Sequence, residues 1–107
     1  MFSRKIKNVS AQEAYKLIND DSEFVILDVR TKDEYDGGHI PGAKLVPVNL
    51  LPMKLAELDE YRDKPVLVYC ASGGRSPRAV DTLVNNDFKN VYHLNRGLSS
   101  WGYSVTR

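Results

Sequence analysis

Residues 65–76 read Pro-Val-Leu-Val-Tyr-Cys-Ala-Ser-Gly-Gly-Arg-Ser, and the interpretation of the whole chain starts from them. The apolar run from Pro65 to Tyr69 is rich in β-forming residues and bounded by turn signals, which predicts a fully buried strand of a parallel sheet. Pro77 can open a helix, and Ser76 is suited to be its N-cap. A helical apolar stripe follows at Ala79, Val80, Leu83 and Val84. Cys70 is therefore predicted at the carboxyl edge of a sheet, facing a helix N-terminus, where open α/β sheets form ligand crevices.

The loop after the cysteine has the composition of an anion-binding turn. It consists of Ala71, Ser72, Gly73, Gly74 and Arg75. Glycines allow successive N–H groups to converge on one concave side, and the helix N-terminus adds positive potential. Such surroundings favour a cysteine thiolate, which is the nucleophilic form. The alternative is that the cysteine is a small buried hydrophobic residue, but two arginines beside a helix N-terminus, at positions 75 and 78, favour a bound anion.

This loop resembles the catalytic loop of single-domain rhodaneses, which are sulfurtransferases. Three further segments resemble signatures of that family in the expected order: Asp28-Val29-Arg30 followed by Glu34-Tyr35, Gly38 through Ala43, and Gly97 through Trp101. Four separated motifs make a specific match over nearly the whole chain. The resemblance implies a three-layer α/β rhodanese-like fold, with a mostly parallel sheet of four or five strands and helices on both faces. We expect residues 1–107 to form one such domain.

The resemblance also implies a rhodanese-type thiosulfate sulfurtransferase and a two-step mechanism. The Cys70 thiolate takes a sulfane sulfur from thiosulfate or a persulfide, small or on a protein, and a cyanide or thiol acceptor then removes it. The N–H groups of residues 71–75 bind the charged persulfide, and no cofactor or metal is required. Arg30 is a further candidate for substrate binding, although an ion pair with Asp28 or Glu34 is an equally good explanation for it.

Two other classes of protein stay open. One is a non-catalytic binding module on the rhodanese scaffold, which the presence of Cys70 within an intact loop disfavours. The other is a cysteine phosphatase or arsenate reductase. Phosphatase loops place five residues between cysteine and arginine, whereas four residues, 71–74, separate them here, and the reductase needs a resolving cysteine that this chain lacks.

Composition sets the broad class of the protein. The apolar content of 42% and charged content of 27% are those of an ordinary soluble domain with a single core. A formal net charge of +1 gives no reason to expect nucleic acid or an acidic membrane as a partner. Basic residues near the N-terminus precede no apolar run, so we expect no signal peptide. The lone cysteine excludes an internal disulfide and fits the reducing cytoplasm.

The remaining patterns predict an alternation of strands and helices. Strands are expected at residues 6–9, 24–29, 44–48 and 91–94, and helices after the capping boxes of Ser10 and Thr31, over 50–58 and over 97–103. Two residues invite a functional interpretation beyond the loop. His39 could act as a general base, but the resemblance assigns its segment a structural role. Arg96 replaces a glycine that often precedes Gly97 in the family, and could place another cation near the site.

Overall fold

The computed structural model describes residues 6–107, and its centre is a five-stranded sheet with the order β1-β5-β4-β2-β3. The four strand pairs of this sheet are all parallel. The strands are β1 (Ile6–Val9), β2 (Val25–Asp28), β3 (Lys44–Leu45), β4 (Val66–Tyr69) and β5 (Val91–Leu94). Parallel strands need crossover connections, so a helical segment follows each strand. All five carboxyl ends therefore meet at one edge of the sheet.

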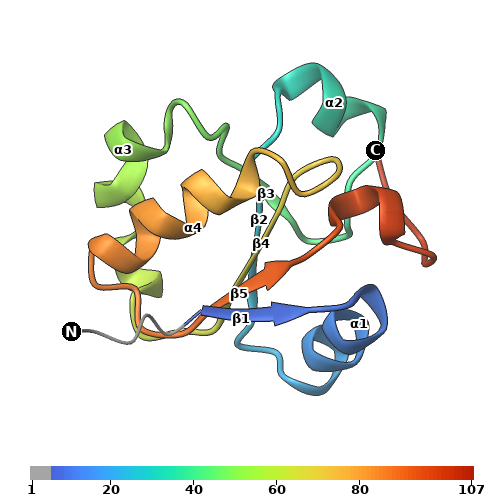
Figure 1. Cartoon of the computed structure of the whole chain (residues 1–107), viewed down its shortest axis with the longest axis horizontal. Coiled ribbons are helices and arrows are strands. Elements are labelled where there is room, and N and C mark those ends of the chain that lie inside the picture. The colour runs from blue at the N-terminus through green and yellow to red at the C-terminus, as the bar shows by residue number, and fades with distance from the viewer. Residues whose placement is uncertain (1–5) are drawn as a thin grey trace.

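Helices cover both faces of the sheet, as Figure 1 shows. On one face lies α1 (Ala11–Asp20). On the other face lie α3 (Leu51–Lys54), the 3-10 helix η1 (Leu55–Tyr61) and α4 (Ser76–Asn85). Two short elements follow the carboxyl ends of β2 and β5: α2 (Lys32–Gly37) and the 3-10 helix η2 (Gly97–Ser100). This arrangement confirms the predicted three-layer α/β class, and the sheet has five strands where four or five were predicted.

The side chains of the central strand β4 divide the core into two halves. Val66 and Val68 pack with Cys70 in the cluster beneath α4. Leu67 and Tyr69 belong to the cluster beneath α1. Successive side chains of a strand point to opposite faces of the sheet, and both faces are covered here. This double burial explains the uninterrupted apolar run that precedes the cysteine.

Several predicted elements are confirmed close to their expected bounds. The strands at 6–9 and 91–94 are β1 and β5, and the strand at 44–48 is the two-residue edge strand β3, which ends before Pro47. Ser10 and Thr31 each form a capping box, in which the side chain accepts the N–H of a glutamate three residues later and that glutamate accepts the cap N–H.

Three predicted helix details are wrong. Arg75, not Ser76, is the N-cap of α4, because the Ser76 hydroxyl faces Cys70 and His93 instead of capping the helix. The helix expected over 50–58 is α-helical only to Lys54 and continues as η1. Residues three apart coincide on a 3-10 helix, which lets Leu55 and Leu58 pack together against the core. The closing helix is the 3-10 turn η2 and ends at Ser100, three residues earlier than expected.

The sequence also predicts that certain features are absent. Within residues 6–107, no helix is long and apolar enough to cross a membrane. The same residues contain no group of three or more His, Cys, Asp or Glu side chains that could hold a metal ion. The expected absence of a signal peptide rests partly on residues 1–5, which lie outside the described part of the chain.

Candidate active site

Cys70 follows the last residue of β4, and its sulfur lies inside a ring of hydrogen-bond donors. The residue is 1% exposed. The N–H groups of Gly73 and Ser76 lie 3.2 and 3.3 Å from Sγ, and the Ser76 hydroxyl oxygen also lies 3.3 Å from it. The loop therefore curls around one atom, and the nearest donors come from its second half and from the first turn of α4.

These donors determine the acidity of the thiol. Burial raises the pKa of Cys70, but hydrogen bonds from the Ser76 hydroxyl and from the N–H groups of Ser76, Arg75 and Gly73 outweigh it, so the net pKa is lowered. The N-terminus of α4 acts on the thiol in the same sense, since its partial positive charge favours an anion. The site is therefore built to hold a negatively charged sulfur.

A second segment of the chain fixes the shape of the loop. The N–H of Leu98 donates to the Cys70 carbonyl and that of Ser99 to the Ala71 carbonyl, both at 2.9 Å. Gly97 has φ +64°, and a Cβ there would lie 2.5 Å from the Cys70 carbonyl oxygen. Only glycine permits so close an approach of two backbones. The Gly97–Trp101 motif thus acts as a backbone support for the Cys70 loop.

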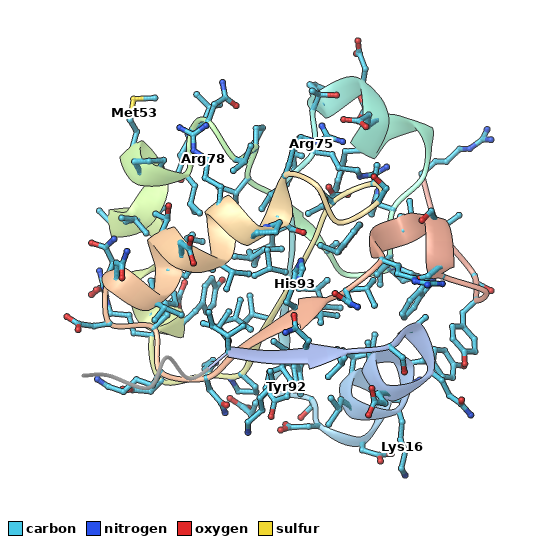
Figure 2. All side chains as sticks on the ribbon, viewed as in Figure 1. Lys16, Met53, Arg75, Arg78, Tyr92 and His93 are labelled. Carbon is cyan, nitrogen blue, oxygen red and sulfur yellow. The ribbon has the colours of Figure 1, made fainter. Side chains whose placement is uncertain are left out.

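Arg75 is turned toward α2. Its guanidinium makes two hydrogen bonds with the Glu34 carboxylate, at 2.8 and 2.9 Å, and Figure 2 shows its side chain at the α2 side of the loop. The hydrogen bond from Arg75 is the main reason that the pKa of Glu34 falls to about 2. The charge of Arg75 is therefore shared with a carboxylate, and the group of this residue that hydrogen-bonds the Cys70 sulfur is its backbone N–H.

Arg30 belongs to a buried cluster beside the loop. Its guanidinium binds Asp28, with Nη2 2.6 Å from Oδ2, and also donates to the Gly38 carbonyl at 2.7 Å. The Tyr69 hydroxyl donates to the same Asp28 oxygen at 2.7 Å and accepts the Ile40 N–H at 3.1 Å. These contacts join β2, β4 and the segment after α2. The ion pair with Asp28 is thus the observed partner of Arg30, and its role in substrate binding stays a prediction.

The other candidates lie outside the donor ring. His39 bonds the Tyr35 carbonyl through Nδ1, stacks on the Tyr35 ring and pairs its backbone with Thr106, which agrees with a structural role. Arg96 is exposed; its backbone lies beside the loop, since a Cβ on Gly73 would be 3.8 Å from Arg96 Cα, and the residue also lines a hollow of about 580 Å³ at the start of α1.

Three polar residues near the sulfur were not assigned to the site from the sequence. Ser76 is the last residue of the segment that resembles the catalytic loop and is expected as a helix cap, whereas His93 and Asn8 are expected within strands, and none of the three is predicted to act on the sulfur. The Ser76 hydroxyl lies 2.6 Å from His93 Nε2, and His93 Nδ1 lies 2.9 Å from Asn8 Oδ1. The available signal was a histidine within the otherwise apolar strand 91–94, which requires a buried polar partner.

The sequence and the fold of the chain are both similar to those of known proteins. Residues 10–103 match the sequence model of the family described as Rhodanese-like domain. The thiosulfate sulfurtransferase GlpE of Coxiella burnetii (strain RSA 331 / Henzerling II) is 38% identical over 100 residues, covering 89% of this chain and 86% of that protein. The crystal structure of a rhodanese-related protein from Thermoplasma volcanium superimposes with a TM-score of 0.83 at 31% identity, covering 94% of this chain and 97% of the other.

Other relatives are longer than this chain. The tRNA uridine(34) hydroxylase of Pectobacterium carotovorum subsp. carotovorum (strain PC1) is 40% identical over 83 residues, which cover 74% of this chain and 23% of the hydroxylase. A further relative at 40% identity is matched over 62% of its length. The chain thus spans less than two thirds of the length of each of these two relatives.

Proposed function

The chain belongs to the family of rhodanese-like domains, and from this premise we propose that it is a sulfurtransferase that works through a persulfide on Cys70. The proposed donor is thiosulfate or a persulfide, either a small molecule or a protein, and the proposed acceptor is cyanide or a thiol. We place the reaction in the reducing cytoplasm, where a lone thiol stays available.

One observation carries the proposal: the ring of N–H and O–H donors around the Cys70 sulfur. Gly73, Arg75 and Ser76 supply backbone donors, and Ser76 adds a hydroxyl. The thiolate attacks the sulfane sulfur of thiosulfate, the S–S bond breaks, and sulfite leaves with the bonding electron pair. The charge then lies on the outer sulfur of the persulfide, which N–H groups of the 71–75 loop would stabilise as an oxyanion hole stabilises oxygen.

The second step regenerates the enzyme. Cyanide attacks the outer sulfur, a carbon–sulfur bond forms, and Cys70 leaves as the thiolate that the loop already favours. A thiol acceptor reacts in the same way and becomes a persulfide. Each step transfers one neutral sulfur atom from a leaving group, which keeps the bonding electron pair, to an attacking nucleophile, so the residues of this chain need only bind an anion and supply a good leaving group.

Loop length supports sulfur over phosphate as the transferred group. Four residues separate Cys70 from Arg75, and the observed donors converge on a single sulfur atom. A phosphoryl group has three equatorial oxygens and needs more donors and more space. In addition, the Arg75 guanidinium that would bind such oxygens is held by Glu34.

The test compares two reactions in the wild-type protein and in Cys70→Ser. We expect thiosulfate:cyanide transfer by the wild type, no hydrolysis of an aryl phosphate, and complete loss of transfer in the variant, because a serine hydroxyl is a far weaker nucleophile at neutral pH. The melting temperature of the variant serves as the control for folding. Transfer by the folded variant would refute the mechanism, and an inactive wild type that binds a partner would favour the non-catalytic module.

A further inference from the structure

A buried chain of hydrogen bonds leads away from the Cys70 sulfur through Ser76. It runs from Sγ to the Ser76 hydroxyl at 3.3 Å, from there to His93 Nε2 at 2.6 Å, and from His93 Nδ1 to Asn8 Oδ1 at 2.9 Å. Ser76 is 0% exposed and His93 6%. Neither the cysteine nor its loop requires a titratable side chain next to Ser76, so the presence of His93 there calls for a separate explanation.

The register of the sheet places these groups together. Asn8 in β1 is the direct neighbour of His93 in β5, and His93 is the direct neighbour of Val68 in β4. All three side chains point to the face that α4 covers, and Cys70, directly after β4, is the next residue of the chain on that face. Figure 2 shows His93 on the α4 side of β5 and Tyr92 on the other. Ser76, in the first turn of α4, closes the gap between the cysteine and the histidine.

Asn8 determines which ring nitrogen carries the proton. Its Oδ1 can only accept a hydrogen bond, so His93 Nδ1 donates to it and Nε2 of the neutral ring is left as an acceptor. The Ser76 hydroxyl then donates to Nε2, and its oxygen accepts from the Cys70 thiol. Every member of the chain is satisfied in this arrangement.

A second fully satisfied arrangement exists, and it differs only in the position of two protons. With His93 as imidazolium, Nε2–H donates to the Ser76 oxygen, and the Ser76 hydroxyl donates to a Cys70 thiolate. A thiolate beside a neutral imidazole is less favourable, because the single Ser76 proton would have to serve two acceptors. Thiolate formation and protonation of the ring are therefore coupled through the hydroxyl.

We propose that His93 is a positioning residue that takes up the Cys70 thiol proton through the Ser76 hydroxyl, so that thiolate and imidazolium form together before sulfur transfer. The S–H bond breaks as an O–H bond forms at Ser76, and the original Ser76 proton forms the N–H bond at Nε2. No atom is oxidised or reduced, and no external base is needed. This inference deepens the proposed function and rests on it for its biological role, but the proton transfer can be measured without any sulfur substrate.

The surroundings of the ring suit a base that is neutral at rest. Burial lowers the pKa of His93, which keeps the ring unprotonated while Cys70 is a thiol. The ring borders a hollow of about 320 Å³ that is also lined by Asn8, Gly73 and Asp81. Asp81 is the titratable residue that shares this hollow with His93, and the hollow offers a route by which the proton can later reach water. Lys7, the cation next to Asn8, lies instead over the Tyr92 ring on the other face.

The first experiment measures the alkylation rate of Cys70 by iodoacetamide against pH, in the wild type and in His93→Gln. Glutamine can keep a hydrogen bond to Ser76 but cannot titrate, so a merely structural histidine would leave the profile unchanged. We expect the midpoint to rise by about one pH unit or more, which lowers the rate at pH 6 about tenfold. His39→Asn is the matched control, because it removes the chain's other histidine and should not shift the midpoint.

Further variants test whether the proton passes through the hydroxyl. Ser76→Ala should raise the midpoint like His93→Gln, and the double variant should rise no further than the larger single effect, because both changes interrupt one path. A His93→Gln profile that coincides with the wild-type profile would overturn the proposal, as would fully additive shifts. Lack of sulfur transfer alongside a normal wild-type profile would refute the function and leave the relay intact.

A second measurement is decisive even if the His93 variants do not fold. Coupling is reciprocal, so removal of the thiolate must change the histidine. We expect the NMR titration of His93 in Cys70→Ser to show a lower pKa than in the wild type, since the thiolate stabilises the imidazolium. An unchanged His93 titration would overturn the proposal.

Discussion

At the scale of single residues, the two adjacent glycines of the Cys70 loop differ in what they do. Gly73 has φ +97°, and a Cβ there would lie 2.5 Å from the Asn95 carbonyl oxygen. Gly74 has an ordinary φ, and a Cβ there would meet no atom within 4 Å. Gly73 also supplies an N–H to the sulfur. Only the first of the pair therefore needs to be glycine for the loop to keep its shape.

This difference predicts the effect of alanine at each position. Gly73→Ala adds a strained φ, which costs about 1–2 kcal/mol, and a clash with backbone that cannot move freely. We expect a melting temperature lower by roughly 5 °C or more and a large loss of sulfur transfer. Gly74→Ala is the matched control and should change the free energy of unfolding by less than about 0.5 kcal/mol. Equal melting temperatures for the two variants would contradict the loop geometry.

At the scale of elements, the ion pair between Arg75 and Glu34 joins the loop before α4 to α2. Two hydrogen bonds connect the side chains. Glu34 is also the N3 residue of α2, where it forms the capping box with Thr31. One carboxylate thus holds the start of α2 and the end of the Cys70 loop. The partner of Arg75 in the folded chain is thus Glu34, and this ion pair has a structural role.

The ion pair predicts a specific dependence of stability on pH. The folded pKa of Glu34 is about 2, whereas an unfolded glutamate titrates near ~4.3. The pair therefore stabilises the fold fully above about pH 5 and is lost as the pH falls toward 2. In urea unfolding, Glu34→Gln should be less stable than the wild type at pH 7, and the difference should shrink as the pH approaches 2. Glutamine keeps the capping geometry, so a difference that stays constant with pH would contradict this assignment.

At the scale of the whole molecule, parallel order brings distant segments to one edge of the sheet. The Cys70 loop follows β4, and the 97–101 segment that supports it follows β5, the neighbour of β4. The supporting hydrogen bonds join backbone groups, so this support depends on topology more than on side chains. Cys70 is also the only cysteine of the chain, so a persulfide formed there has no second thiol within the molecule.

A persulfide on this protein should therefore persist until an external acceptor arrives. After incubation with excess thiosulfate and desalting, we expect the intact mass to increase by one sulfur atom. Cyanide or a small thiol should then restore the starting mass. The donor ring around Sγ slows loss of the anionic sulfur to water. A disulfide-linked dimer as the main product, or an unchanged mass, would show that Cys70 does not carry sulfur.

Much of the fold was predictable from the chain because its signals are local. The apolar run 65–69, the turn residues on either side and the capping boxes at Ser10 and Thr31 act over a few neighbouring residues. Burial of both faces of a parallel sheet makes such a strand apolar at every position. The same local pattern pointed to Cys70, since a cysteine between such a strand and a glycine loop lies at the carboxyl edge of the sheet.

The partners of the site residues depended on contacts between segments that are far apart in sequence. Arg75 and Glu34 are 41 residues apart, and His93 and Asn8 are 85 apart. Strand order brings β1 beside β5 and β5 beside β4, and no local pattern encodes that order. Three features of the site follow from this packing. Arg30 pairs with Asp28, residue 73 must be glycine, and the Ser76 hydroxyl contacts the Cys70 sulfur instead of capping α4. Local propensity selects the elements, whereas hydrogen-bond partners are selected by whichever buried groups the tertiary fold leaves within reach.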